Sequence, residues 1–308
     1  MPGAGRSENK PVWRDKSAIR GQIRGRPLLF VPVEGDNTEN MSESEEGLSF
    51  LCARLVASDD CDAKALRIVC GKLGALLERG KTEKSALSDD ECACVEAAAV
   101  KLWNASVALR NAFTQHSETS EPEPSDTPTT VALLRGTALA LLQLVVAAMP
   151  NTLTSAEVRT RILSIAVAAG RAFQDITDNR NAEGAFEIAS QYAQDESDEF
   201  VIQKVVKESA MLLVYKAELM WTTSQSNVAF HLMNRVCSPR FLEMIGIREI
   251  DVIANTCIKL SKSVQHASDS VQWLKIALNL YSSIAPSPKT AKRKVCPVLS
   301  RRGINPSR

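Results

Sequence analysis

The chain has 308 residues, of which 44% are hydrophobic and 5% aromatic, and its formal net charge is +1. Because positive and negative charges nearly balance, the chain is not one of the proteins whose whole surface is basic or acidic for binding a partner of opposite charge. Many Ala and Leu residues with few aromatic side chains favour helices over a β-sandwich or barrel. The length allows one large core or a short array of repeats.

Eight cysteines lie mostly within apolar helical runs, where a thiol acts as a small hydrophobic group. They form no paired CxxC groups with histidine partners, so no metal site is predicted. The polar N-terminus lacks the apolar core of a secretory signal. These features predict a reducing, intracellular environment. The cysteines are Cys52, Cys61, Cys70, Cys92, Cys94, Cys237, Cys257 and Cys296.

Residues 1–46 are predicted to be a disordered leader. The first part is rich in Gly and Arg, and the second part is acidic and rich in Ser and Asn, so neither part buries enough apolar surface to offset the cost of ordering. Trp13 and the run Leu28–Val31 allow a second interpretation, a short docking motif within this leader.

Residues 285–308 are predicted to be a basic, disordered tail, because Pro286 and Pro288 end the last helix. No acidic residue follows Lys289. Three interpretations apply: a nuclear import signal, an arm for nucleic acid, or a solvated tail without a specific role. Direct DNA binding is not expected, and only the tails offer a route to it. The candidate import signal is Lys292, Arg293 and Lys294.

Hydrophobic periodicity predicts four helices before residue 150. Ser88 or Asp89 is expected to cap the third helix by accepting a hydrogen bond from a free backbone N–H. Three prolines between residues 117 and 130 predict a loop before the fourth. The predicted helices are Leu48–Ala57, Asp62–Glu78, Asp89–Phe113 and Thr129–Ala148.

The apolar run Val131–Ala148 approaches the ~20 residues that a helix needs to cross a bilayer. Arg135 and Gln143 interrupt it, and a charged group within a membrane-spanning helix is energetically costly. An acidic loop also precedes it. We therefore predict a buried helix of a helical array, with no membrane contact.

The stretch Ile162–Ala189 carries the pattern on which the fold prediction depends. Two helical segments flank a polar segment, Gln174–Asn181, which is predicted to turn the chain. Small residues on both segments allow two antiparallel helices to cross closely, with phenylalanine rings beside the crossing. This spacing fits the hairpin of a tetratricopeptide (TPR) repeat. The residues that carry it are Gly170, Phe173, Ala182, Phe186 and Ala189.

Helix pairs recur about every 45 residues, longer than the ~34 residues of a standard TPR. The second helix of the first pair has a stripe formed by Ala182, Phe186 and Ala189. In the third pair, the corresponding positions are assigned to Ser270, Leu274 and Ala277. In the middle pair, they are assigned to Val228, Leu232 and Arg235. The recurrence predicts an all-α, TPR-like helical-hairpin solenoid over residues 48–284. The predicted pairs are Ser155–Phe173 with Ala182–Ala193, Glu199–Thr222 with Asn227–Cys237, and Arg248–Val264 with Asp269–Ile284.

A helix containing Leu102-Trp103-Asn104 precedes these pairs, and Val271-Gln272-Trp273-Leu274-Lys275 lies in the last one. Together they resemble the meiosis-specific TPR proteins of the Zip-four type, which are fungal sporulation proteins and their testis-expressed animal relatives. The resemblance implies a chromosome-associated nuclear scaffold that promotes synaptonemal complex assembly and crossover recombination. It also implies that the partners are other meiotic synapsis and crossover proteins. Members of this family are usually much longer.

Catalytic motifs are missing from the sequence, so we expect no enzyme, no cofactor and no small-molecule substrate. The histidines His116, His231 and His266 have no metal-ligand partners at helical spacing. Cys92 and Cys94 point to different faces of one helix.

Two further questions stay open at this stage. Trp221 and Trp273 fit either a peptide groove or packing between repeats. The alternative function is a general TPR-like adaptor or chaperone co-factor without a meiotic role. A basic clamp for an acidic peptide would support it, but the first helices show only Lys204, Lys207 and Lys216 and no clear ladder.

Overall fold

The computed structural model describes residues 47–58, 63–80, 87–117, 126–149, 156–193, 199–263 and 266–284. This part of the chain contains helices and no strand, which confirms the all-α prediction. The predicted leader, the tail with its candidate import signal, Cys61 and Cys296 lie outside it. The helices are α1 Leu48–Ala57, α2 Ala63–Gly80, α3 Asp89–Ser117, α4 Thr127–Ala148, α5 Ala156–Asp175, α6 Asn179–Tyr192, α7 Glu199–Thr222, α8 Ser226–Val236, α9 Pro239–Leu242, α10 Ile247–Lys262 and α11 Ala267–Ile284.

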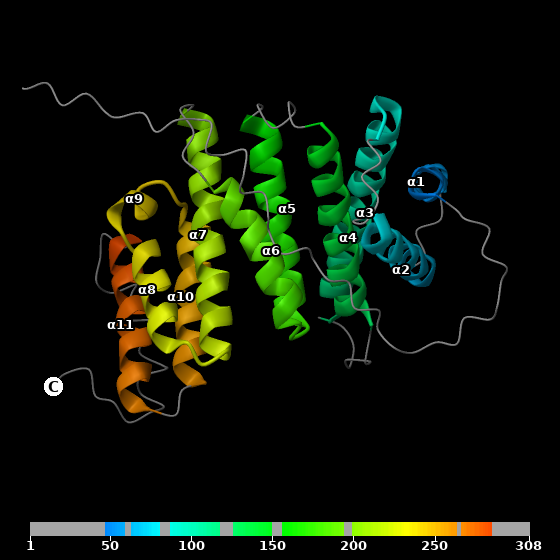
Figure 1. The fold of residues 1–308 in the computed structure, drawn as a ribbon. Helices are drawn as coiled ribbons and strands as arrows, with labels where there is room; N and C mark the ends of the chain where they lie inside the picture. The colour runs from blue at the N-terminus through cyan, green and yellow to red at the C-terminus, as the bar shows by residue number, and fades with distance from the viewer. Residues whose placement is uncertain are drawn as a thin grey trace, which may run out of the picture.

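Successive helices pair in chain order. Helix α3 packs on α4, α5 on α6, α7 on α8 and α10 on α11 (Figure 1). Helices α4, α5, α7 and α10 follow one another as neighbours in a row, while α1 and α2 pack on α3 and α4. The four-residue helix α9, which the sequence did not predict, lies between the last two pairs.

Helix α7 contributes to two hydrophobic cores from opposite faces. Val205, Leu212 and Leu219 lie seven residues apart and are buried in the core that α1 to α6 build. A second row, Ala210, Val214 and Ala217, is buried in the core that α8, α10 and α11 complete. A helix with apolar residues on two faces belongs between two layers. Helix α7 therefore joins the two cores.

The turn between α5 and α6 is shorter than the predicted segment Gln174–Asn181. Helix α5 continues to Asp175, and α6 begins at Asn179. The Asp178 side chain accepts a hydrogen bond from the backbone N–H of Asn181 at 3.1 Å, which caps α6. Thr177 adopts a positive φ of 62° within this turn. Capping by Asp178 therefore starts the second helix earlier than its apolar stripe indicates.

Ser88, and not Asp89, caps helix α3. Its hydroxyl accepts a hydrogen bond from the Glu91 backbone N–H at 3.3 Å, and the Glu91 carboxylate accepts one from the Ser88 backbone N–H at 2.9 Å. This reciprocal pair is a capping box. The same carboxylate accepts a hydrogen bond from the Ser49 hydroxyl at 3.0 Å, so the cap also fixes α1 against the start of α3. These hydrogen bonds lower the pKa of Glu91, and the bond from the Ser88 backbone N–H is the largest cause.

Two described helices are long and apolar enough to cross a membrane by length and composition alone, one within α3 and the other α4. In the most apolar window of α4, 67% of the residues are buried inside the fold. Core helices of soluble proteins pass the same composition test. Burial against α2, α3 and α5 accounts for the apolar character of α4.

The stripe assigned to the middle second helix, α8, is wrong by one residue. Val228 is 44% exposed and Arg235 is exposed, because the helix turns a different face inward. Ala229, Met233 and Val236 are each 0% exposed and take the i, i+4, i+7 positions. The corrected stripe matches that of α6 and α11 in spacing and burial.

The crossing of α5 and α6 depends on Gly170. A Cβ atom at this position would lie 2.4 Å from Cε1 of Phe186, and the Phe186 ring is 0% exposed. Phe173 is 1% exposed, and Ala182 and Ala189 are 0% exposed. The predicted small and bulky residues are therefore packed together at this crossing, and glycine is required for its closeness.

The substitution Gly170→Ala is expected to lower the free energy of unfolding by about 1–3 kcal/mol, because the methyl group overpacks a core that has no room for it. Denaturant titration followed by circular dichroism measures this loss. The matched control is Gly71→Ala in α2, where a Cβ would meet nothing within 4 Å. There the better helix propensity of Ala is expected to raise stability by about 0.5–1 kcal/mol. Equal effects of the two substitutions would contradict the crossing argument.

Candidate protein-binding face

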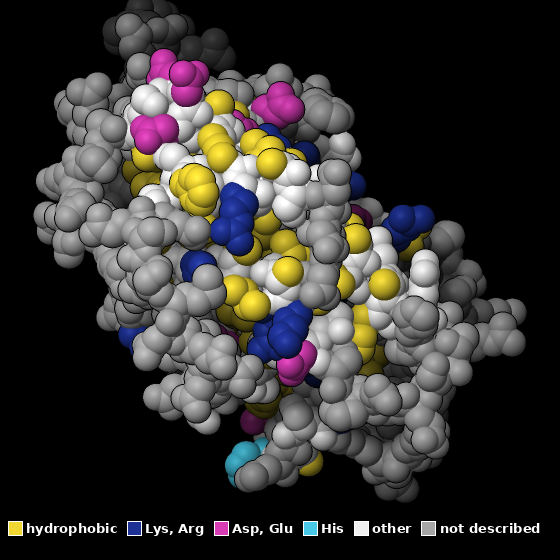
Figure 2. Space-filling model, turned by 90° about the vertical axis from the view of Figure 1, so that its right-hand side faces the viewer, with side chains coloured by type: hydrophobic (Ala, Val, Ile, Leu, Met, Phe, Trp, Pro, Cys, Tyr) yellow, Lys and Arg dark blue, Asp and Glu magenta, His cyan; other side chains and the backbone are white. Residues whose placement is uncertain are grey.

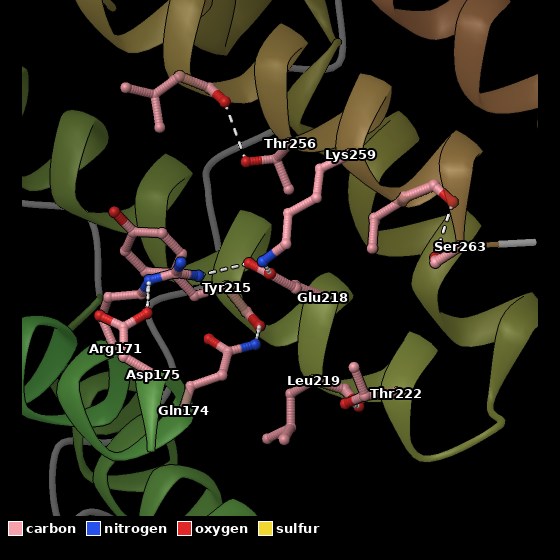
Figure 3. A network of polar contacts seen from close by, with 12 residues as sticks. Arg171, Gln174, Asp175, Tyr215, Glu218, Leu219, Thr222, Thr256, Lys259 and Ser263 are labelled. Carbon is pink, nitrogen blue, oxygen red and sulfur yellow. Dashed lines mark hydrogen bonds and ion pairs between the residues drawn. The ribbon is translucent and has the colours of Figure 1, made fainter. Parts of the chain in front are cut away.

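A buried carboxylate connects α5, α7 and α10, which are the first helices of the last three helix pairs. Glu218 on α7 has a side chain that is 6% exposed. Its Oε2 atom accepts a hydrogen bond from Nη1 of Arg171 on α5 at 2.5 Å, and its Oε1 atom accepts one from Nζ of Lys259 on α10 at 2.6 Å (Figure 3). A buried carboxylate is costly unless it is paired and hydrogen-bonded. Glu218 meets both conditions, and so it ties α5, α7 and α10 together.

Arg171 is held by several partners at once. Its Nε atom lies 3.0 Å from Oδ1 of Asp175, and its guanidinium lies 5.0 Å from the centre of the Tyr215 ring. Gln174 donates a hydrogen bond to the Tyr215 backbone carbonyl at 3.3 Å. Burial lowers the pKa of Arg171, but the charges of Glu218 and Asp175 outweigh it and the net shift is upward. Arg171 therefore stays charged at neutral pH.

A second polar contact links α5 and α7 two to three turns away. The Ser164 hydroxyl donates a hydrogen bond to the Glu208 carboxylate at 2.9 Å. Burial raises the pKa of Glu208, and the charge of Glu249 on α10 acts in the same direction, while Ser164 and Lys204 oppose the shift. Helices α5 and α7 are thus joined by two separate polar contacts, one at Glu208 and one at Glu218.

The aromatic residues at the C-terminal end pack on one another. Trp273 is 0% exposed, and its ring stacks on Phe230 with 4.4 Å between centroids. Trp221 meets both rings edge-on, at 5.3 Å from Trp273 and 5.5 Å from Phe230. Leu274 is 4% exposed and Ala277 is 0% exposed. Trp273 on α11 therefore packs against Trp221 of α7 and Phe230 of α8, and its buried ring does not line a groove.

Trp103 has a different environment from Trp273. It is partly buried against the first core, and its ring faces the guanidinium of Arg135, whose Cζ atom lies 5.3 Å from the ring centre. Arg135, which interrupts the apolar run of α4, is itself 4% exposed. Helix α3 thus supplies an aromatic ring to a buried cation on α4.

Apolar side chains are exposed at the N-terminal end of the array. Figure 2 shows them among scattered Lys and Arg side chains on the described part of this end. Phe50 is 56% exposed, Ile68 is 53% exposed and Phe113 is 41% exposed. These three side chains lie on three different helices, α1, α2 and α3, and each exposes apolar surface of its own.

The described residues contain no group of three or more His, Cys, Asp or Glu side chains that could hold a metal ion. His231 and His266 are exposed, and the His116 side chain is not described. The six described cysteines are free. Burial raises the pKa of Cys70 to about 11 and that of Cys237 to about 11, so these thiols are protonated at neutral pH.

Comparisons with known proteins add no identification. No family model matches the chain, and neither curated proteins nor solved structures gave a match.

Sequence reasoning missed the Glu218 network. Its three members stand on three helices far apart in the chain, and each occurs in an ordinary amphipathic pattern. The available signal was Glu218 itself, a charged residue between Ala217 and Leu219 in an apolar stretch. A carboxylate on a face that is otherwise buried needs a cationic partner.

The substitution Glu218→Gln is expected to lower the free energy of unfolding by about 1.5–3 kcal/mol, the usual worth of hydrogen bonds to a charged group. The neutral amide cannot compensate the two cations that face it. Denaturant titration measures the loss. Glu243→Gln, at an exposed position after α9, is the control and is expected to change stability by less than about 0.5 kcal/mol. A neutral result for Glu218→Gln would show that the network does not stabilise the array.

Proposed function

We propose that the chain forms a TPR-like helical-hairpin solenoid and acts as a protein-binding scaffold in meiosis. The observation that carries the proposal is the recurrence of one stripe on three second helices. Ala182, Phe186 and Ala189 on α6 have counterparts on α8 and α11 with the same spacing, and all of these positions are buried. Units that bury one face against a neighbour build an array with an extended surface for partners. The counterparts are Ala229, Met233 and Val236, and Ser270, Leu274 and Ala277.

The row of first helices supports the binding role. Glu218 holds α5, α7 and α10 in a fixed arrangement, which keeps a partner-binding face preorganised. Exposed apolar side chains on α1 to α3 offer a further contact surface. A scaffold of this kind needs no catalytic group and no cofactor.

The meiotic part of the proposal comes from the resemblance to proteins of the Zip-four type. The Trp103 helix ahead of long-period hairpins is its basis. We infer a nuclear, chromosome-associated protein that bridges synapsis and crossover proteins. A general adaptor or chaperone co-factor is the second candidate, because the hairpin geometry is common to both and only the resemblance favours meiosis.

The proposal predicts that an endogenously tagged chain forms foci on chromosomes in meiotic prophase, and that its loss reduces synapsis and crossovers. Immunofluorescence of chromosome spreads and proximity labelling in meiotic and non-meiotic cells test this. Labelling of chromosome-axis proteins only in meiosis would support the scaffold. Constitutive labelling of chaperones away from chromosomes would instead support the general adaptor.

A further inference from the structure

One face of α3 carries an apolar groove with a volume of about 610 Å³. Every described residue that lines the groove belongs to α3. Most of the lining side chains are small, and large side chains of a second segment interdigitate well with small ones. The groove therefore has room for an apolar segment laid along α3. Its apolar lining residues are Ala97, Val100, Ala105, Ala108, Leu109 and Ala112.

Helix α1 runs beside the first part of α3. The Ser49 hydroxyl, near the start of α1, donates a hydrogen bond to the Glu91 carboxylate at 3.0 Å. Near the end of α1, the Val56 carbonyl accepts a hydrogen bond at 3.2 Å from Nζ of Lys101, which also lines the groove. Helix α1 ends one residue after Val56, whereas α3 continues to Ser117. The groove thus extends along α3 past the end of α1.

The described part of the chain leaves this groove exposed. Ala97, Ala108 and Ala112 are exposed, and Phe113 beside them is 41% exposed. The ends of a repeat array normally have a polar outer surface, which keeps the array soluble. Helix α3 lies toward one end of the row in Figure 1, so an apolar groove on it needs cover.

Two apolar runs lie outside the described residues, at residues 28–33 and 295–299. The loops next to α3, residues 81–86 and 118–125, contain no Leu, Ile, Val or aromatic residue. Residues 295–299 follow α11, which lies at the opposite end of the row from α3 (Figure 1). Residues 28–33 precede α1, which packs directly on α3. The run at residues 28–33 is therefore the apolar run attached beside the groove.

The connection to α1 is long enough for this run to reach the groove. Residues 34–46 are polar apart from Met41, and they span at most about 45 Å when fully extended. Helix α1 begins at the level of Glu91, and Ala112 at the far end of the groove lies about 32 Å further along α3. A short tether also keeps the local concentration of the run in the millimolar range.

We propose that residues 28–33 of the chain's own N-terminal segment dock in the groove of α3 and cover this end of the array. Six extended residues span about 20 Å, and the groove from Ala97 to Ala112 follows about 22 Å of helix axis. Alternate side chains of an extended segment share a face, which places Leu28 and Phe30 together. This contact needs no partner protein, so it is independent of the proposed scaffold role.

Photo-crosslinking in the whole chain tests this contact. p-Benzoylphenylalanine is introduced at Ala97 or, separately, at Ala112, and mass spectrometry of the irradiated chain identifies the residues to which it becomes attached. Attachment to residues 28–33 is expected from both positions. Phe30→Asp is expected to reduce this attachment about tenfold or more in a chain whose circular dichroism is unchanged, because an apolar groove offers a carboxylate no partner.

Val298→Asp is the matched control, because it places the same charge in the other apolar run. It is expected to change the attachment less than about twofold, since that run is tethered at the opposite end of the array. Equal losses for the two substitutions would overturn the proposal, as would no attachment to residues 28–33. A mixture of ¹⁵N-labelled and unlabelled chains separates attachment within one chain from attachment between two. Attachment between two chains would show that a second copy covers the groove, and attachment to residues 295–299 would show that the tail does. Either result would contradict docking of residues 28–33 within one chain.

Discussion

Helix α7 is buried on two opposite faces, and the continuity of the molecule depends on this. One face carries larger residues, Val205, Leu212 and Leu219, toward the core of α1 to α6. The other carries Ala210, Val214 and Ala217, whose small side chains let α8 and α10 approach closely. A helix with a single apolar face would leave one of the two cores open to water. The two halves of the array are therefore not independent units.

Helix positions were well predicted, because long apolar periodicity is a strong local signal. The register of α8 was not, since Val228 and Leu232 are as apolar as Ala229 and Met233. Periodicity alone cannot choose between two adjacent apolar stripes, and only packing against α7 decides which one turns inward. Helix α9 has four residues, too few for any periodicity. The start of α6 was missed because the cap at Asp178 outweighs the absence of apolar residues after it.

Local sequence patterns did not predict the polar contacts in the interior. Arg135 served in the sequence as an argument against a membrane span, whereas the structure places it in a junction of three helices. Glu218 and Arg135 are both nearly buried, but Glu218 has two cations and Arg135 has only neutral partners. Which buried charge is compensated depends on the relative rotation of neighbouring helices, which no single helix encodes. The interior thus holds one buried charge that cationic partners compensate and one that only neutral groups contact.

The two halves of the Glu218 bridge differ in their access to water. The Arg171 side chain is 24% exposed, whereas the Lys259 side chain is 66% exposed. Counter-ions screen an exposed ammonium far more than a sheltered guanidinium. Rising ionic strength therefore weakens the joint between α7 and α10 before it weakens the joint between α5 and α7. The last hairpin is consequently joined to the row by the salt-sensitive half of the bridge, whereas α5 and α7 are joined by its sheltered half.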